Sequence, residues 1–322
     1  MNVELKNLSF DAACLARTDV LVVLVAKDFK VPATTSALGA WLQQAVKTGG
    51  LGGSGATQVQ SFADPRFVAK QVVAVHVDSG DADGVRSSLA ACVKSLSSSN
   101  VKTVLVSVHA LQLHASSANK RDWSQALVGA IEQGSYLYTT SKSTTVGKPF
   151  NARVTICADD ALAMAPEFAV AKAVASGVAV AKEWANRPAN LATPTHLGDQ
   201  AKAMGKLRNM QVQVMGPREV AKLKMGSFMA VAQGSTEPLR FIVMQYKGAP
   251  QTQAPVVLVG KGITFDTGGI SIKPSPDMDE MKYDMGGAAS VLGAMQAIGE
   301  LQPKVNVVAL IPSCENMPDA NA

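Results

Sequence analysis

The chain has 322 residues, which is enough for about two domains of ordinary size. Apolar residues make up 47% of the sequence and charged residues 17%, a composition that is typical of packed globular proteins and excludes an intrinsically disordered chain. The formal net charge of +5 is small for this length, and acidic residues stand among the 30 lysines and arginines, which argues against a nucleic-acid-binding surface.

Cysteine spacing and hydropathy argue against a secreted or membrane protein. The four cysteines are far apart and have no histidine at ligand spacing, which predicts buried free thiols in a reducing compartment. The N-terminus carries Glu4 and no basic segment that leads into an apolar one, so we expect no secretory signal. The apolar run Val20–Ala26 is far shorter than the ~20 residues of a membrane span. We therefore expect a cytoplasmic protein without membrane contact.

Apolar strands and amphipathic helices alternate in the first half of the chain. Strands are predicted at residues 20–26, 72–77, 101–108 and 153–157, where β-branched residues form runs or alternate. Between them, helical spacing of apolar residues predicts a helix within 81–99 and another through Trp123, Leu127 and Ile131. Residues 1–160 are therefore predicted to form an α/β domain.

The histidines of this first domain are predicted to be structural. His76, His109 and His114 lie in or near the apolar strands. A hydrogen-bonded histidine is more common there than a catalytic one. We expect no catalytic centre in this domain.

An alanine-rich helix over residues 166–186 is expected to connect the first domain to a second one, with the connector at 161–190. Thr193 is a predicted N-cap, and Pro194 would be the first residue of the next helix. Further strands are expected at 211–215, 241–246, 255–259 and 305–311, and helices at 217–225, stopped by Gly226, and 286–301. Residues 191–322 thus form a second α/β unit, in which polar residues gather where strands give way to loops, the edge at which open α/β sheets bind ligands.

Two lysines and two aspartates lie among glycines after the strand expected at 255–259. Asp266 and Asp284 each follow an apolar or aromatic segment, which predicts sheltered carboxylates that need a cationic partner. The available partners are Lys261, Lys273 and metal ions. From these residues alone, two Lys–Asp ion pairs that hold loops together are the simpler interpretation, and a metal site is the alternative.

This region resembles the leucyl aminopeptidase (M17) family of dinuclear metallopeptidases. The resemblance is carried by Val259-Gly-Lys-Gly-Ile-Thr-Phe-Asp-Thr-Gly-Gly, Met281-Lys-Tyr-Asp-Met-Gly-Gly and Glu315-Asn-Met-Pro, with Asn186-Arg-Pro-Ala-Asn-Leu upstream. It is specific from Val256 to Pro318 and general in the first domain. It implies that the metal ligands are Lys261, Asp266 and Asp284, that Lys273 is a catalytic lysine, and that Met281 lines the pocket for an apolar first side chain.

The resemblance also implies an activity. The expected enzyme is a cytoplasmic, hexameric aminopeptidase that releases N-terminal, preferably apolar, residues from peptides by metal-activated water. Asp266 would bridge two divalent ions, manganese or zinc. Lys261 can bind a metal only as a neutral amine, whereas Lys273 must stay protonated to stabilise an oxyanion.

The family pattern continues beyond Glu-Asn-Met-Pro into an Asn-Thr-Asp-Ala-Glu-Gly-Arg-Leu motif that this chain lacks. That motif supplies two more carboxylate ligands and a catalytic arginine. We therefore expect an incomplete catalytic domain that binds at most one metal tightly and has impaired activity, with a sheet edge and apolar surface exposed beyond the last strand. Two alternatives stay open: an inactive assembly or DNA-binding protein of the same fold, and a metal-dependent phosphohydrolase.

Overall fold

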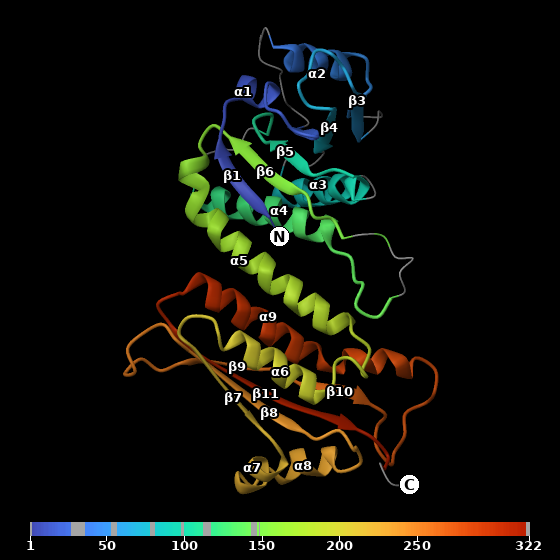
Figure 1. Cartoon of the computed structure of the whole chain (residues 1–322), viewed down its shortest axis with the longest axis vertical. Coiled ribbons are helices and arrows are strands. Elements are labelled where there is room, and N and C mark those ends of the chain that lie inside the picture. Colours follow the sequence, from blue (N-terminus) through green and yellow to red (C-terminus); the bar gives the residue numbers. More distant parts are fainter. Residues whose placement is uncertain are drawn as a thin grey trace. The chain divides into compact units, whose positions relative to one another are not determined.

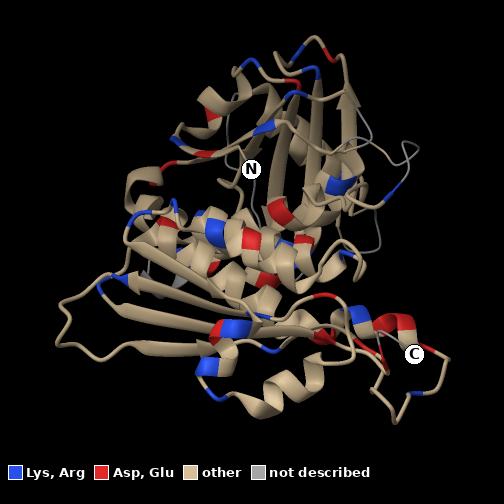
Figure 2. Ribbon diagram, turned by 60° about the horizontal axis from the view of Figure 1, so that its bottom comes forward, with Lys and Arg blue, Asp and Glu red and all other residues tan. Residues whose placement is uncertain are grey.

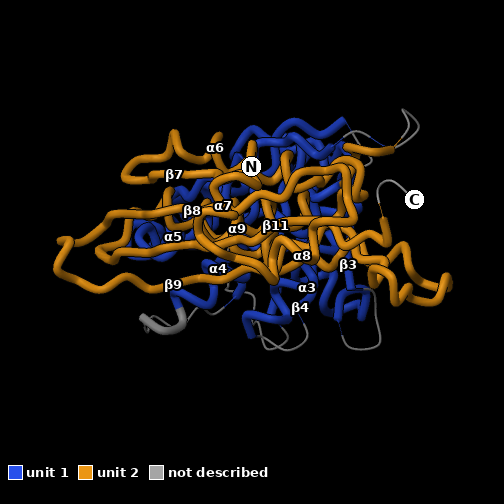
Figure 3. The backbone as a smooth tube through the Cα atoms, turned by 90° about the horizontal axis from the view of Figure 1, so that it is seen from below, with its two compact units in different colours: residues 1–137, 146–172 blue, residues 138–145, 173–322 orange. Residues whose placement is uncertain are grey.

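The computed structural model describes residues 2–26, 36–52, 57–77, 81–97, 100–111, 117–142, 147 and 149–319 (Figure 1). The chain divides into two compact units, residues 1–137 with 146–172 and residues 138–145 with 173–322 (Figure 3). Helix α5 (Ala161–Asn186) contains the division, so the helix that the sequence places between two domains contributes residues to both units.

A six-stranded sheet in the order β1-β6-β5-β2-β4-β3 forms the centre of unit 1. All neighbouring strands are parallel except β3, which pairs antiparallel with β4. The elements are β1 (Val3–Asn7), α1 (Phe10–Cys14), β2 (Val20–Ala26), α2 (Ala37–Lys47), β3 (Gln58–Phe62), β4 (Gln71–Val77), α3 (Ala82–Leu96), β5 (Thr103–Ser107), α4 (Ser117–Ser135) and β6 (Arg153–Ala158). The α/β prediction for this part of the chain is confirmed.

In unit 1 the structure confirms the predicted strand β2, the helix α3 and the buried cysteines. The central strand β2 buries all its residues but the last, because its sequence is apolar on both faces. Helix α3 begins where Asp81 caps it, by accepting a hydrogen bond from the backbone N–H of Gly84. All four cysteines are free and buried, as predicted. Burial raises the pKa of the Cys92 thiol to about 12, which keeps it unreactive.

His109 is hydrogen-bonded on both ring nitrogens, as a structural histidine should be. Its Nδ1 lies 2.8 Å from Ser107 Oγ, and its Nε2 lies 2.7 Å from the carbonyl oxygen of Leu8. The imidazole therefore ties the end of β5 to the end of β1. His76 is buried on β4, and His114 lies outside the described residues.

Unit 2 is built on a sheet in the order β10-β11-β8-β7, with β9 also paired to β11. Strand β11 is antiparallel to β8 and parallel to both β9 and β10, which follow one another along its other side. The elements are α6 (Pro194–Met204), β7 (Met210–Met215), α7 (Pro217–Lys222), α8 (Gly226–Ala232), β8 (Arg240–Lys247), β9 (Val256–Val259), β10 (Gly262–Asp266), the 3₁₀ helix η1 (Met278–Met285), α9 (Gly286–Leu301) and β11 (Asn306–Asn316).

Helices α9 and α6 and the end of α5 contribute to one hydrophobic core with this sheet (Figure 1). Leu292 on α9, Leu197 on α6 and Ile242 on β8 are fully buried in it. By length and composition α5 is the one described helix that could cross a membrane. Its Trp184 is nevertheless buried in this core, which is the packing of a helix in a folded domain.

One expectation about unit 2 is wrong. Gly226 does not stop the helix expected at 217–225: α7 ends at Lys222, Lys224 adopts a left-handed φ of 56°, and Gly226 begins α8. The expected sheet edge is found beside the last strand: β11 continues to Asn316 between β8 and the β9–β10 side, so the edge falls at β9 and β10. Exposed apolar side chains accompany this edge, as expected, at Val256, Val257 and Val259 of β9, and Ile270 and Ile272 in the loop after β10 are exposed as well.

Candidate active site

The site is built where β10 leaves the sheet of unit 2. Strand β10 pairs in parallel with β11, and Asp266 stands opposite Asn316 at the carboxyl ends of both strands. Lys261 lies in the break between β9 and β10, where its carbonyl oxygen accepts from the backbone N–H of Ala288 at 2.8 Å. Gly260 is required beside it, because a Cβ there would lie 2.7 Å from the carbonyl oxygen of Gly287. The start of α9 therefore packs directly on this break.

The structure places the five predicted site residues in two groups of contacts, which the helix η1 connects. Lys261 Nζ lies 2.7 Å from Asp284 Oδ1. Lys273 Nζ lies 2.8 Å from Asp266 Oδ2 and 3.0 Å from Met281 Sδ. Met281 and Asp284 are three residues apart in η1, and such residues share one side of a 3₁₀ helix. Both ion pairs expected from the sequence form, and η1 joins them.

Burial differs between the two kinds of charge. The side chains of Asp266 and Asp284 are only 16% and 19% exposed, so both carboxylates are sheltered as predicted. The side chains of their partners Lys273 and Lys261 are 36% and 61% exposed. Solvent therefore reaches the site from the side of the lysines.

One oxygen of Asp284 suits a cation. Its Oδ2 is buried and has no hydrogen-bond partner among the described residues. An unpaired buried carboxylate oxygen is costly, and a metal ion would supply the missing interaction. No three His, Cys, Asp or Glu side chains converge on a metal site in the described part of the chain. The donors at hand, Asp266, Asp284 and the Lys261 amine, fit part of a metal shell.

Asp266 is held in its charged form by several hydrogen bonds. Burial by itself raises the pKa of this carboxyl group, but hydrogen bonds from Lys273, the Gly268 N–H and Asn316 outweigh it. The pKa of Asp266 therefore lies below its ordinary value. An ionised carboxylate at the end of two parallel strands is what a metal ligand requires.

Sequence reasoning assigned no role to Asn316, although it stands in the Glu-Asn-Met-Pro stretch. Its Nδ2 donates to Asp266 Oδ1 at 2.7 Å. The neighbouring Glu315 accepts a hydrogen bond from Ser235 Oγ at 2.6 Å, which joins the end of β11 to the loop before β8. The signal that could have found Asn316 is the parallel pairing of β10 with β11, since such pairing puts strand ends at one edge.

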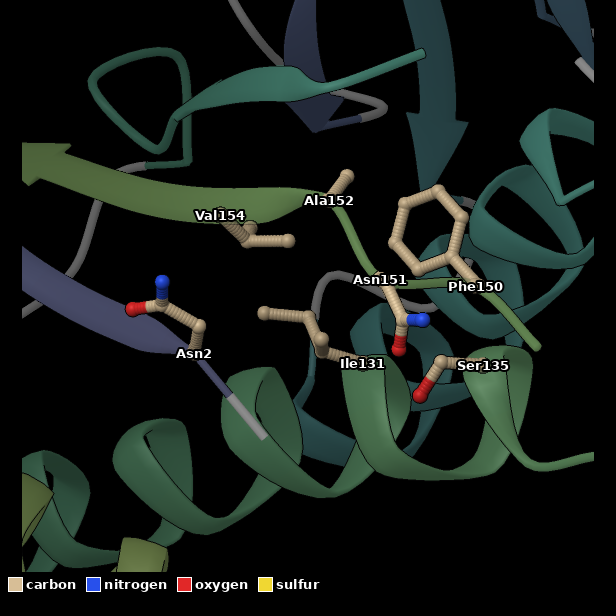
Figure 4. Close-up of a pocket in the computed structure, with 7 residues that line it drawn as sticks. All are labelled: Asn2, Ile131, Ser135, Phe150, Asn151, Ala152 and Val154. Carbon is tan, nitrogen blue, oxygen red and sulfur yellow. The ribbon is translucent and has the colours of Figure 1, made fainter. Parts of the chain in front are cut away.

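Outside this site, the described residues show scattered charges and a cavity. Lysines and arginines are scattered over both units with acids among them (Figure 2). Unit 1 holds a cavity of about 330 Å³ between β6, the end of α4 and the start of β1 (Figure 4). Its described lining consists of Asn2, Ile131, Ser135, Phe150, Asn151, Ala152 and Val154. None of these residues is charged, so we assign no chemistry to the cavity.

The sequence of this chain is similar to those of known aminopeptidases. Residues 179–322 match the family described as "Cytosol aminopeptidase family, catalytic domain". The whole chain is 49% identical to a "Probable cytosol aminopeptidase" of Acidovorax ebreus (strain TPSY) and spans 63% of that protein. It is 45% identical to another from Polaromonas sp. (strain JS666 / ATCC BAA-500) and spans 62% of it.

Solved structures agree with these sequence matches. A mutant of tomato leucine aminopeptidase superposes with a TM-score of 0.79 at 24% identity, over 98% of this chain and 63% of that one, which establishes the fold. The bottromycin maturation enzyme BotP in complex with Mn gives a TM-score of 0.71 at 26% identity, over 95% of this chain and 61% of that one. Residues 179–322 are therefore similar to the catalytic domain of the cytosol aminopeptidase (M17 peptidase) family, and the chain spans less than two thirds of the length of these relatives.

Proposed function

We propose that this chain carries part of the active site of a metal-dependent aminopeptidase. The observation that supports the proposal most directly is that η1 carries both Asp284, the partner of Lys261, and Met281, a partner of the Lys273 that also binds Asp266. This arrangement gathers two carboxylates and two lysine side chains at the edge where α/β sheets bind ligands. The family resemblance assigns a role to each of these groups.

The metal would be held by Asp266, Asp284 and Lys261. Asp284 offers Oδ2, which is buried without a hydrogen-bond partner among the described residues. Lys261 would have to release a proton before its amine could bind, and its exposed side chain allows water to take that proton. A bound divalent ion, manganese or zinc, would polarise the scissile carbonyl group and activate water.

Lys273 would stabilise negative charge on the carbonyl oxygen of the substrate. Its ammonium group is ion-paired with Asp266 and also contacts Met281 Sδ, so its position is fixed by two elements. A fixed cation of this kind favours a transition state in which an oxyanion develops. Lys273 therefore needs its charge, in contrast to Lys261.

Met281 would form an apolar wall beside the first side chain of the substrate. Its sulfur lies 3.0 Å from Lys273 Nζ, which puts an apolar side chain next to the group that would meet the scissile bond. Substrates with an apolar N-terminal residue follow from this placement. Peptides are thus the proposed substrates, and a cytoplasmic homo-hexamer is the proposed assembly.

The number of metal ligands limits how tightly the chain would bind metal ions. Three protein donors are too few to hold two ions tightly. We therefore propose that this chain binds at most one ion tightly and turns over substrate more slowly than its longer relatives.

Metal analysis combined with a turnover assay tests the proposal. Zinc and manganese bound per chain would be measured with turnover of Leu-p-nitroanilide, for the wild type and for Asp284→Asn, alongside the Acidovorax ebreus relative. We expect one tightly bound ion that the variant loses. Failure of the wild type to bind either metal would overturn the metal site. Two tightly bound ions with turnover equal to that of the relative would overturn the limit of one ion. A panel of phosphate esters would reveal a phosphohydrolase.

A further inference from the structure

The two oxygens of the Asp266 carboxylate have different partners. Oδ1 accepts from Asn316 Nδ2 at 2.7 Å and from the backbone N–H of Gly268 at 2.8 Å. Oδ2 accepts from Lys273 Nζ at 2.8 Å. Because a carboxylate oxygen has about two acceptor sites, neutral donors fill Oδ1, and Oδ2 keeps one site for a further cation.

Asn316 is itself fixed by the residue that follows Asp266. Its backbone carbonyl oxygen accepts from Thr267 N at 2.9 Å and from Thr267 Oγ1 at 2.8 Å. Thr267 is buried, and Asp266 and Asn316 are partners in the register of β10 and β11. The amide that holds Asp266 therefore belongs to the end of a paired strand.

The loop after Asp266 is shaped to pass beside this amide. Gly269 has a φ of 74°, and a Cβ on it would lie 3.0 Å from Asn316 Oδ1. Gly268 has a φ of 90° and supplies the second N–H to Oδ1. Both left-handed glycines thus let the loop turn tightly around the supported side of the carboxylate.

We propose that Asn316 is a positioning residue of the metal site, which orients Asp266 so that Oδ2 faces the cations. The inference rests on the proposed function, because it concerns how Asp266 would meet a metal ion. Groups that hold a metal ligand in place in this way typically contribute about 10–100-fold in metal affinity.

A matched control lies on the same strand. Asn306, at the start of β11, makes three side-chain hydrogen bonds, to Ala249 N at 3.0 Å, Pro250 O at 2.9 Å and Gln253 O at 3.0 Å. None of its partners touches Asp266. Asn306→Ala therefore weakens β11 without removing the support of the carboxylate, and it separates a structural effect from a positioning effect.

The test is a calorimetric titration of the full chain with Mn²⁺, accompanied by urea unfolding of each variant. We expect Asn316→Ala to weaken Mn²⁺ affinity by about 10–100-fold and Asn306→Ala to leave it at the wild-type value. Asn316→Leu keeps the volume of the side chain and should show the same loss of Mn²⁺ affinity. It replaces Asn316→Ala in the test if the alanine variant does not fold.

The outcomes distinguish the inference from the proposed function. Wild-type Mn²⁺ affinity in Asn316→Ala or Asn316→Leu, together with lost binding in Asp266→Asn, overturns the inference alone. An equal loss of affinity in Asn306→Ala also overturns it, because the effect would then come from the stability of β11. Unchanged binding in Asp266→Asn, or no Mn²⁺ binding by the wild type, overturns the proposed function and the inference with it.

Discussion

Gly177 on α5 lies so close to Gly293 on α9 that a Cβ added to Gly177 would stand 2.3 Å from the carbonyl oxygen of Gly293. The reverse is also true, with 2.5 Å from a Cβ on Gly293 to the carbonyl oxygen of Gly177. Both residues belong to unit 2. The pair sets the distance between two helices, since any side chain would push their backbones apart.

Alanine at either position should therefore destabilise unit 2. We expect Gly177→Ala to lower the free energy of unfolding by about 1–3 kcal/mol, the usual cost of overpacking, despite the better helix propensity of alanine. Urea unfolding measures the change. Gly286→Ala is the control on α9, because no atom lies within 4 Å of a Cβ there, and it should be neutral or stabilising. A neutral Gly177→Ala would contradict the close packing.

In this fold, the bounds of a strand are predicted more accurately from the sequence when the strand is buried. Strand β2 was predicted with its observed bounds, since a strand buried on both faces is a continuous apolar run. Strand β3, with the sequence QVQSF, was missed because an edge strand needs few apolar residues. The strand expected at 305–311 continues for five more residues, to Asn316, and passes through Pro312, a residue that lacks an N–H and is uncommon in a central strand.

The same error explains what was missed in the site. The Lys–Asp pairs could be predicted because unlike charges near glycines in one stretch have few other partners. Because the last strand was expected to end at residue 311, Asn316 fell outside it, and its register with Asp266 could not be seen. Contacts between strands distant in sequence depend on the sheet order, which local patterns do not determine.

Acid should weaken unit 1 through Asp19. Hydrogen bonds from Lys70 and from the backbone N–H groups of Lys102 and Thr103 lower the pKa of Asp19 from 3.8 to about 2. A carboxyl group whose pKa is depressed by folding contributes stability above its unfolded-state pKa and loses it as pH falls. We expect the free energy of unfolding of the wild type to fall between about pH 4 and pH 2 more steeply than that of Asp19→Asn.

Urea unfolding at several pH values would check this expectation. The pH dependence of Lys70→Met should lie between those of the wild type and Asp19→Asn. The side chain of Lys70 is 80% exposed, so water screens its charge, whereas the two backbone donors are fixed. Lys70→Met should therefore keep most of the pH dependence. An Asp19→Asn variant with the same acid slope as the wild type would exclude Asp19 as the cause.

His109 should matter for stability and not for metal binding. Replacing it with alanine leaves Ser107 Oγ and the carbonyl oxygen of Leu8 without their imidazole partner. We expect His109→Ala to lower the free energy of unfolding by about 1–3 kcal/mol, the cost of unsatisfied buried polar groups. Mn²⁺ affinity should stay at the wild-type value in calorimetry, and a selective loss of metal binding would contradict the structural role.

The exposed valines of β9 should promote self-association. Val257 is 53% exposed on β9, whose one strand partner among the described residues is β11, so apolar surface and unpaired backbone groups lie together at the sheet edge. Val257→Lys should reduce aggregation in light scattering and leave the free energy of unfolding within about 0.5 kcal/mol of the wild type. Val307→Lys, on the buried partner strand β11, should unfold the domain instead. Unchanged scattering in Val257→Lys would exclude this edge.

Without metal, Asp284 should lower the stability of the chain relative to a variant with an apolar residue at this position. Its Oδ2 is buried without a hydrogen bond from any described residue, while its partner Lys261 is largely exposed and gains little from the ion pair. We therefore expect Asp284→Leu to unfold at a free energy equal to the wild type or up to about 2 kcal/mol higher when metal is absent. The residue would be retained at a cost to stability because a cation needs it.

Adding Mn²⁺ should reverse that order. A ligand that binds the folded chain alone stabilises it by about 2.7 kcal/mol at a concentration 100 times its dissociation constant. The wild type should gain this stability in urea unfolding with Mn²⁺ present, and Asp284→Leu should gain much less. If Asp284→Leu were destabilised without metal, the buried oxygen would have to be satisfied in the folded chain; if both proteins gained equally from Mn²⁺, Asp284 would not be a ligand.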